Sequence, residues 1–300
     1  MFSVKSFEPY PGKHLFIFRN FIAEGFQAKS GDYPESIHNI MNFDFSWKAL
    51  LKPGLSDRYF DLTGVKEFEI HAKGYSTVNA WWLSELSRLV YRHGKDGNGK
   101  SPVREDILKK AGFSEIRTFC KEGGHFCSLI VSERDNSSPF AVLAFRGTTG
   151  IEGWFSNFNV VQTPWDEGGL VHSGFIYVFF QLWDEIEAAL FTLDIPIFYT
   201  GHSLGGAFAT LAASKRPPEA VYGFGSPRVG DSVFADSMRR TRLYRVVNNQ
   251  DIFTTVPLSG IPFDYCHAGE QINLSDYDIS CPSNGIPRFL TMAYILSLIT

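Results

Sequence analysis

The chain has 300 residues, of which 44% are hydrophobic and 15% aromatic, and its formal net charge is −4. This length allows one large domain or two small ones with a sizeable apolar core. The small negative charge gives no electrostatic reason to expect nucleic acid or an anionic membrane surface as a partner. The longest apolar runs, at 175–180 and 289–299, fall short of the ~20 residues of a membrane-spanning helix. We therefore expect a soluble protein without a transmembrane segment.

The N-terminus and the cysteines bear on the compartment. No basic start leading into a long apolar stretch is visible, so the sequence shows no signal peptide, and removal of one from a longer chain is the alternative. The four cysteines are too few for a disulfide scaffold and lack metal-site spacing. A two-residue hairpin turn at Gly123-Gly124 would place Cys120 opposite Cys127, within the range of a disulfide. That bond would favour a secreted or periplasmic protein, and two free core thiols are the alternative.

Secondary-structure patterns divide the chain into two parts. Residues 1–75 are irregular and rich in Phe, Pro and Gly, and we interpret them as an N-terminal extension packed on a main domain, residues 76–300. The first helix signal is at 77–91, with Thr77 as the expected N-cap. Strand and helix patterns then alternate. We expect strands at 128–132, 140–145, 197–200, 221–224 and 243–247, and helices at 175–190 and 204–215. The alternation predicts an α/β fold, with a mostly parallel central sheet and helices on both faces.

A G-x-S-x-G motif surrounds Ser203, within the stretch I-F-Y-T-G-H-S-L-G-G at 197–206. A serine on a sharp turn between a buried strand and a helix has little room, so the residues two before and two after it must be small. Gly201 and Gly205 meet this requirement. The apolar strand pattern before the motif and the alanine-rich helix pattern after it are the context of a nucleophile elbow. Ligands of open α/β sheets bind at this end of the strands.

A nucleophilic serine also needs partners. A base must take its proton, and an acid must orient that base. Asp251 follows the predicted strand 243–247 and is the best-placed acid after Ser203. The other acids, which we interpret as surface or turn residues, are Asp231, Asp236, Asp264, Asp276 and Asp278. Acyl transfer further requires backbone N–H donors for the oxyanion, and we expect them from Leu204, directly after the nucleophile, and from Thr148, after the strand 140–145.

Six ordered motifs between residue 75 and the C-terminus resemble those of the class 3, or fungal-type, triacylglycerol lipases of the α/β-hydrolase superfamily. They are F-R-G-T at 145–148, W-x-x-N at 154–157, V-H-S-G-F at 171–175, G-H-S-L-G-G at 201–206, F-G-S-P-R-V-G at 224–230 and N-Q-D-I-F-T-T-V-P at 249–257. The resemblance implies an α/β-hydrolase fold, with Ser203 as the nucleophile, Asp251 as the acid, and Thr148 and Leu204 as the oxyanion hole.

The resemblance also implies a lid. The segment 149–161 looks like the amphipathic lid over the active site, and its apolar residues are Ile151, Trp154, Phe155 and Phe158. Aromatic side chains on a short segment beside a catalytic serine either cap the site or contact an oil surface. The expected partners are therefore a lipid ester substrate and a lipid–water interface, with no metal and no cofactor.

The general base departs from the family pattern. That pattern places the catalytic histidine near the C-terminus, a few residues before a tyrosine, where this chain reads I-P-R-F-L-T-M-A-Y at 286–294 with Phe289 at the equivalent position. The only histidine after Asp251 is His267, in a Y-C-H-A-G-E stretch that resembles a separate family motif. The chain order serine, acid, histidine favours His267 as the base, whereas the motif alignment favours a site without a base.

These observations predict a serine hydrolase that cleaves carboxylic esters of lipids through an acyl-serine intermediate. Triacylglycerol is the default substrate by resemblance. Phospholipase A1 and feruloyl-type esterase activities are alternatives, because the shape of an acyl pocket cannot be read from sequence. The missing C-terminal histidine supports a different hypothesis, in which a lipase-like protein keeps the fold, has weak or no catalysis and serves as a binding or interaction module.

Overall fold

The computed structural model of the chain describes residues 59–60, 66–92, 103–121, 126–133, 138–147, 160–247, 256–257 and 264–273. All of them lie in one compact unit of the chain, Ser46–Leu298. The predicted N-terminal extension, 1–75, lies largely outside the described residues. Of the helices in the described part, none combines the length and the apolar character that crossing a bilayer requires.

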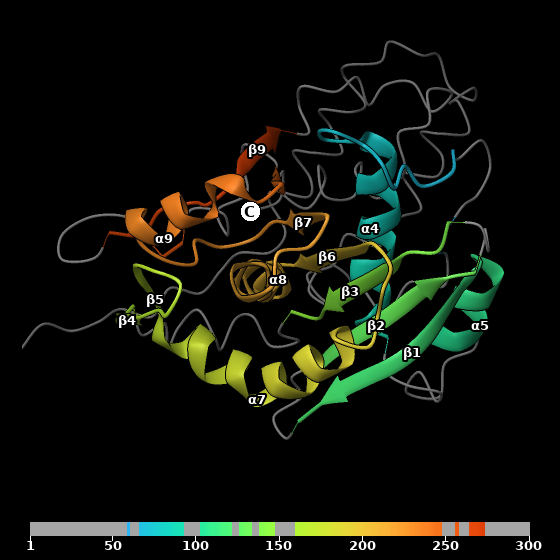
Figure 1. The fold of residues 1–300 in the computed structure, drawn as a ribbon, viewed down its shortest axis with the longest axis horizontal. Helices are drawn as coiled ribbons and strands as arrows, with labels where there is room; N and C mark the ends of the chain where they lie inside the picture. Colours follow the sequence, from blue (N-terminus) through green and yellow to red (C-terminus); the bar gives the residue numbers. More distant parts are fainter. Residues whose placement is uncertain are drawn as a thin grey trace, which may run out of the picture. The chain divides into compact units, whose positions relative to one another are not determined.

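A seven-stranded sheet forms the centre of the described unit (Figure 1). Its strands, in spatial order, are β1 (Phe113–Cys120), β2 (Phe126–Ser132), β3 (Ala141–Phe145), β6 (Ile197–His202), β7 (Ala220–Phe224), β8 (Leu243–Val247) and β9 (Glu270–Asn273). β1, β2 and β3 pair antiparallel, and every pair from β3 to β9 is parallel. The central strands are largely apolar along their whole length, because a parallel sheet is buried on both faces. The mostly parallel sheet was therefore predicted correctly.

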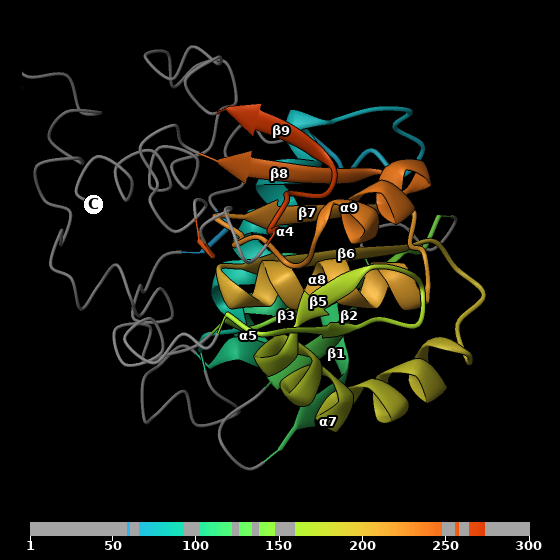
Figure 2. The ribbon, with the colours of Figure 1, turned by 90° about the vertical axis from the view of Figure 1, so that its left-hand side faces the viewer.

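Helices cover both faces of this sheet (Figure 1 and Figure 2). One face carries α4 (Thr77–Leu89) and α5 (Arg104–Lys110), and the other carries α7 (Ser173–Leu190), α8 (Leu204–Lys215), and α9 (Ser232–Ser237), which runs on into η3 (Met238–Arg240). Strand residues alternate between the two cores, as Val142 packs with the α4 side and Leu143 with the α8 side. A separate two-stranded sheet joins β4 (Gln162–Pro164) to β5 (Leu170–His172).

Two predictions about local structure were wrong. Ser76, not Thr77, is the N-cap of α4, and its hydroxyl accepts the Asn79 N–H at 3.1 Å. Cys120 does not lie opposite Cys127, because Cys120 pairs with Phe126 in the hairpin register. A shift of one residue turns a side chain to the other face of the sheet. Both thiols are free, with Cys127 buried and Cys120 exposed, so this pair no longer supports an oxidising compartment.

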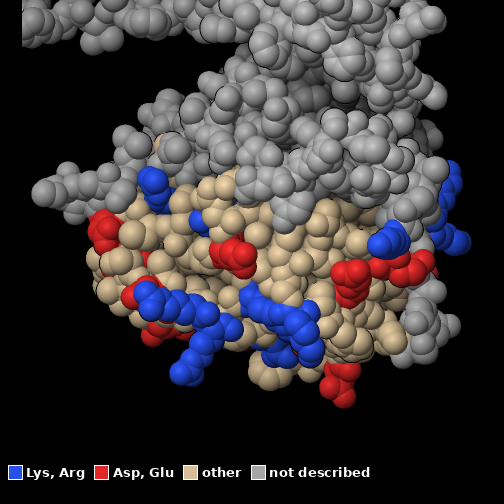
Figure 3. Space-filling view, turned by 90° about the horizontal axis from the view of Figure 1, so that it is seen from above, with Lys and Arg blue, Asp and Glu red and all other residues tan. Residues whose placement is uncertain are grey.

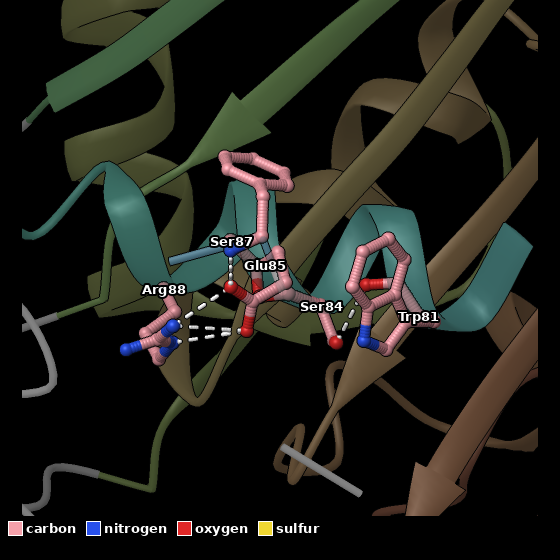
Figure 4. Close-up of polar contacts among 6 residues, drawn as sticks. Trp81, Ser84, Glu85, Ser87 and Arg88 are labelled. Atoms are coloured by element: carbon pink, nitrogen blue, oxygen red, sulfur yellow. Dashed lines mark hydrogen bonds and ion pairs between the residues drawn. The ribbon is translucent and has the colours of Figure 1, made fainter. Parts of the chain in front are cut away.

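A short piece of chain before α4 is anchored to that helix by a buried ion pair. The Glu85 carboxylate lies 2.7 Å from the Arg88 guanidinium, and the backbone N–H of Phe60 donates to the same carboxylate at 2.7 Å. Figure 4 shows Glu85 and Arg88 facing each other along α4. The Phe60 ring is buried against Trp81 and Trp82. These contacts make Phe60 part of the core on the α4 side.

The surface carries both signs of charge. On the face drawn in Figure 3, the described Lys and Arg side chains are interspersed with Asp and Glu side chains. Among the described residues several charges pair, for example Arg242 with Glu219 at 2.6 Å and Arg239 with Asp236 at 2.8 Å. Such exposed pairs contribute little to stability. The mixed charge of this face agrees with the small net charge of the whole sequence.

Candidate active site

Ser203 alone forms the turn between β6, which ends at His202, and α8, which begins at Leu204. Its φ of 55° and ψ of −128° are unusual for a residue with a side chain and are unfavourable by about 1–3 kcal/mol. Two backbone hydrogen bonds hold it there. The Ser203 N–H donates to the Phe224 carbonyl at 2.8 Å, and the Ser203 carbonyl accepts from the Gly206 N–H at 2.9 Å. The predicted elbow is therefore present.

The glycines of the motif are required by close backbone contacts. A β-carbon on Gly201 would lie 2.2 Å from the carbonyl carbon of Gly205. A β-carbon on Gly205 would lie 2.2 Å from the Phe145 oxygen and 3.0 Å from the Gly147 nitrogen. Real β-carbons do not approach backbone atoms this closely. The prediction that both residues must be small is confirmed, and the contacts leave no room even for a β-carbon.

Leu204, one of the two expected oxyanion donors, begins helix α8 directly after Ser203. Leu204 is the first residue of α8, so its N–H has no carbonyl of a preceding helical turn to bond with. The positive end of the helix dipole at this point also favours a developing negative charge. On the opposite side, β3 ends at Phe145, and the following chain to Gly147 packs directly on the elbow. Thr148, the second expected donor, is the next residue and lies outside the described residues.

Two histidines, His202 before the elbow and His172 at the start of α7, are neutral at pH 7. Burial lowers the pKa of His202 to about 4, and its Nδ1 lies 3.1 Å from the hydroxyl of Tyr91. Burial also lowers the pKa of His172 to about 4. His172 is the N-cap of α7, where its Nδ1 accepts the Gly174 N–H at 3.1 Å, and its ring stacks on Phe175 at 4.2 Å. The histidine of the V-H-S-G-F motif therefore has a structural position at the start of a helix.

The predicted acid follows a strand that ends at the same edge of the sheet as the elbow. Val246 of β8 pairs with Phe224 of β7, and Phe224 pairs with His202 of β6. The chain that leaves β8 thus starts at the level of Ser203. Asp251 comes a few residues later and lies outside the described residues, as do the expected lid residues and Phe289.

The alternative acids that the structure describes have local partners. Asp231 is the N-cap of α9, where its carboxylate accepts the Phe234 N–H at 2.8 Å. Asp264 accepts the Ser232 hydroxyl at 2.7 Å. Asp236 forms the exposed ion pair with an arginine of η3. These contacts agree with the interpretation of the three acids as turn or surface residues.

His267 lies in the connection that leads into β9, three residues before that strand begins. A β-carbon on Gly269, two residues after it, would lie 2.4 Å from the backbone oxygen of Leu243, the first residue of β8. The chain therefore passes from His267 to the amino ends of β8 and β9. Ser203, in contrast, follows the carboxyl end of β6.

Sequence reasoning missed one residue of the site. Tyr91 was included only as the end of a helical pattern, but its hydroxyl contacts His202, which lies 111 positions later in the chain. No local pattern signals a contact of this kind. Among the described residues, no group of three or more His, Cys, Asp or Glu side chains is placed to hold a metal ion.

Comparisons with known proteins show which proteins the chain resembles. Residues 142–260 match the family model described as lipase (class 3). A secreted mono- and diacylglycerol lipase 1 from Fusarium solani is 34% identical over 165 residues, which are 49% of this chain and 49% of that protein. The lipase of Rhizomucor miehei is 30% identical over 194 residues, 55% of this chain and 53% of that protein.

A solved structure extends the likeness to three dimensions. The native propeptide complex of the Rhizomucor miehei lipase superposes with a TM-score of 0.51 and 26% sequence identity, over 63% of this chain and 68% of that chain. The chain spans about half the length of the two relatives named above. Over the segment 142–260 it therefore resembles the class 3 lipases, and its fold is that of the α/β hydrolases.

Proposed function

We propose that this chain hydrolyses carboxylic esters of lipids, with triacylglycerol as the principal substrate, through an acyl-serine intermediate on Ser203. The observation that carries the proposal is the strained Ser203 at the end of β6, directly before the Leu204 amide at the start of α8. A strained serine beside a helix N-terminus fits attack on a carbonyl and stabilisation of the resulting oxyanion. The match of residues 142–260 to the class 3 lipase model supports the choice of an ester as the substrate.

Each step of the reaction has a proposed residue. The Ser203 oxygen attacks the ester carbonyl while a base takes its proton, and the oxyanion accepts hydrogen bonds from the Leu204 and Thr148 amides. The base then gives the proton to the leaving alcohol, and water releases the acid from the acyl-serine. Asp251 is proposed as the acid of the triad, and the sheet edge at which β8 ends supports it. No metal or cofactor has a role in this chemistry.

His267 is the proposed base on chain order, and a site without a base is the competing proposal. The course of the chain from His267 to the amino end of β8 supports the competing one, since Ser203 follows a carboxyl end. In that case the protein keeps a lipase fold, has only residual turnover and acts as a binding module. Phe289 then occupies the place of the base in the sequence pattern.

The segment 149–161 is proposed as a lid that opens at a lipid–water interface. Its aromatic residues support this role, because an apolar surface stabilises an open lid by burying them. The Fusarium solani relative is described as secreted, and we propose an extracytoplasmic compartment for this chain as well. Phospholipids and feruloyl esters are the alternative substrates, because the same site chemistry would cleave them. The substrate comparison below tests both.

Labelling with a fluorophosphonate probe tests the nucleophile. We expect the probe to modify Ser203 alone, because only a serine activated beside an oxyanion hole reacts readily. Peptide mapping should find the label on Ser203 and no label in the Ser203→Ala variant. Turnover of a short p-nitrophenyl ester should disappear in the same variant. A wild-type protein without label and without turnover would reject the hydrolase and support the binding module.

Two further variants identify the base. If His267 is the base, His267→Ala should lower kcat by several orders of magnitude, about as much as Ser203→Ala, because the members of a triad fail together. If the site lacks a base, His267→Ala should leave kcat unchanged and Phe289→His should raise it. Comparing emulsified triglyceride, phospholipid and feruloyl ester then ranks the substrates. High activity that neither variant alters would reject both assignments.

A further inference from the structure

Tyr91 is a buried side chain beside the elbow that belongs to none of the catalytic groups proposed above. It lies two residues beyond the end of α4, with only 5% of its surface exposed. Its hydroxyl lies 3.1 Å from Nδ1 of His202 and 3.4 Å from the backbone oxygen of the same residue. Since His202 is the last residue of β6, Tyr91 contacts the residue that directly precedes the nucleophile.

The same hydroxyl contacts the chain that leads to the second expected oxyanion donor. The phenol of Tyr91 forms a hydrogen bond with the backbone of Gly147. A β-carbon on Gly147 would lie 2.2 Å from the phenol oxygen and 2.7 Å from the backbone oxygen of His202. The end of β3, the end of β6 and the phenol are therefore in direct contact, and no side chain separates them.

The protonation states of the two rings keep this contact in place. The imidazole of His202 is neutral near pH 7 because burial lowers its pKa to about 4, so one of its ring nitrogens can accept a hydrogen bond. Burial raises the pKa of Tyr91, so its phenol keeps its single proton. Nδ1 and the backbone oxygen of His202 both lie within reach of that proton. The phenol oxygen can accept from Gly147 at the same time.

We propose that Tyr91 is a positioning residue that sets the spacing between the two sides of the oxyanion hole. On one side, the Leu204 amide follows the His202–Ser203 turn, and on the other side Thr148 follows Gly147. A hydroxyl bonded to both segments fixes their separation. It also helps to hold the unfavourable backbone of Ser203, which persists only where its surroundings constrain it. The inference rests on the proposed function and deepens the account of the same site.

The direct test is Tyr91→Phe, which keeps the ring and removes the hydroxyl. We expect kcat for a p-nitrophenyl ester to fall about 10- to 100-fold, because an error of about 1 Å in catalytic geometry has an effect of this size. KM should change by less than about twofold, because the link matters for the transition state and not for substrate binding. Affinity for an alkylboronic acid, which forms a tetrahedral adduct with the serine, should fall by the same factor as kcat.

Tyr222→Phe is the matched control. The Tyr222 phenol is also buried, and its oxygen accepts the Ser76 N–H at 3.1 Å on the α4 side of the sheet. Both variants should lose a similar amount of thermal stability, but only Tyr91→Phe should lose kcat and boronate affinity. Equal kcat in the two variants, or a change confined to KM, would overturn the role of Tyr91 and leave the proposed function intact. A wild-type protein without ester turnover would reject the proposed function and this inference with it.

A second pair of variants covers the case in which Tyr91→Phe does not fold. In His202→Asn an amide oxygen can take the place of Nδ1 as acceptor, whereas His202→Leu has no acceptor. Because one hydrogen bond contributes about 0.5–1.5 kcal/mol, kcat of the Asn variant should exceed that of the Leu variant by up to about 10-fold. Equal kcat values in two folded variants would overturn the role of the Tyr91 link.

Discussion

Adding one methyl group at Gly205 should disable the active site while leaving the protein folded. In Gly205→Ala the new β-carbon would lie 2.2 Å from the Phe145 oxygen, against the 3.4 Å at which ordinary contact begins. It would also lie 2.9 Å from the Phe145 carbonyl carbon and 3.0 Å from the Gly147 nitrogen. All three are backbone atoms, so no side chain can rotate to relieve the contact. The end of β3 must move away from α8 by about 1 Å.

The size of the effect follows from that displacement. A misplacement of about 1 Å at a catalytic site lowers the rate about 100-fold. Overpacking of this kind destabilises a protein by about 1–3 kcal/mol, which lowers Tm by several degrees in a domain of this size. We therefore expect a folded variant with about one hundredth of the wild-type kcat/KM on a p-nitrophenyl ester. Its rate of fluorophosphonate labelling at Ser203 should fall by a similar factor.

Gly223→Ala provides the control for this experiment. A β-carbon on Gly223, in the buried strand β7, would lie 3.6 Å from the Ser226 β-carbon, which is ordinary contact. This variant should keep wild-type labelling and turnover. If Gly205→Ala remains folded and is labelled at the wild-type rate, the close packing of β3 on the elbow does not set the catalytic geometry. The reasoning from the glycine contacts would then be wrong.

Three further predictions concern stability and the lid. The pKa of His172 and of His202 is about 4 in the folded protein and about 6.5 in the unfolded chain, so the unfolded chain binds more protons between these values. The free energy of unfolding should thus fall as pH drops from 6.5 to 4, and the contribution of His172 to this fall is about 3 kcal/mol. Urea titrations that give equal free energies of unfolding at pH 7 and pH 5 would contradict this prediction. Glu85→Gln should destabilise by about 3–5 kcal/mol in urea, because it removes the carboxylate charge that pairs with the buried Arg88 guanidinium. A loss below about 1 kcal/mol would mean that water reaches the pair. Trp154→Ser should abolish the extra activity on emulsified long-chain triglyceride and keep turnover of a soluble short ester, whereas equal loss on both substrates would show that the segment is structural.

The features that sequence predicted are those fixed by local requirements. The strands β3 and β7 are continuous apolar runs, β6 and β8 are largely apolar, and the elbow needs glycines at set positions, so these features are visible in the residues alone. β1 was missed because it is an edge strand with few buried residues and a register shift between Glu115 and Arg117 that breaks the alternation. The hairpin pairing of the cysteines failed because a difference of one residue reverses the face of every side chain.

The residues of the candidate site also separate into those that the local sequence predicts and those that it does not. Ser203 and Leu204 were predictable because they are adjacent in the chain and their geometry follows from the strand–turn–helix pattern. Tyr91 was not, because its contact with His202 joins segments 111 positions apart and depends on how α4 packs on the sheet. The roles of Asp251 as the acid and of Thr148 as an oxyanion donor stay predictions, since both residues lie outside the described ranges.

The anchoring of Phe60 to α4 sets a lower limit on the length of chain that can form a complete core. A fragment beginning at residue 66 would contain every described helix and strand, yet it would lack the Phe60 ring that fills the space beside Trp81 and Trp82. It would also remove the backbone N–H that the Glu85 carboxylate accepts. Losing a buried phenylalanine side chain alone destabilises a protein by about 3–5 kcal/mol. Expression fragments of this domain should therefore begin before residue 59, well upstream of the first regular element.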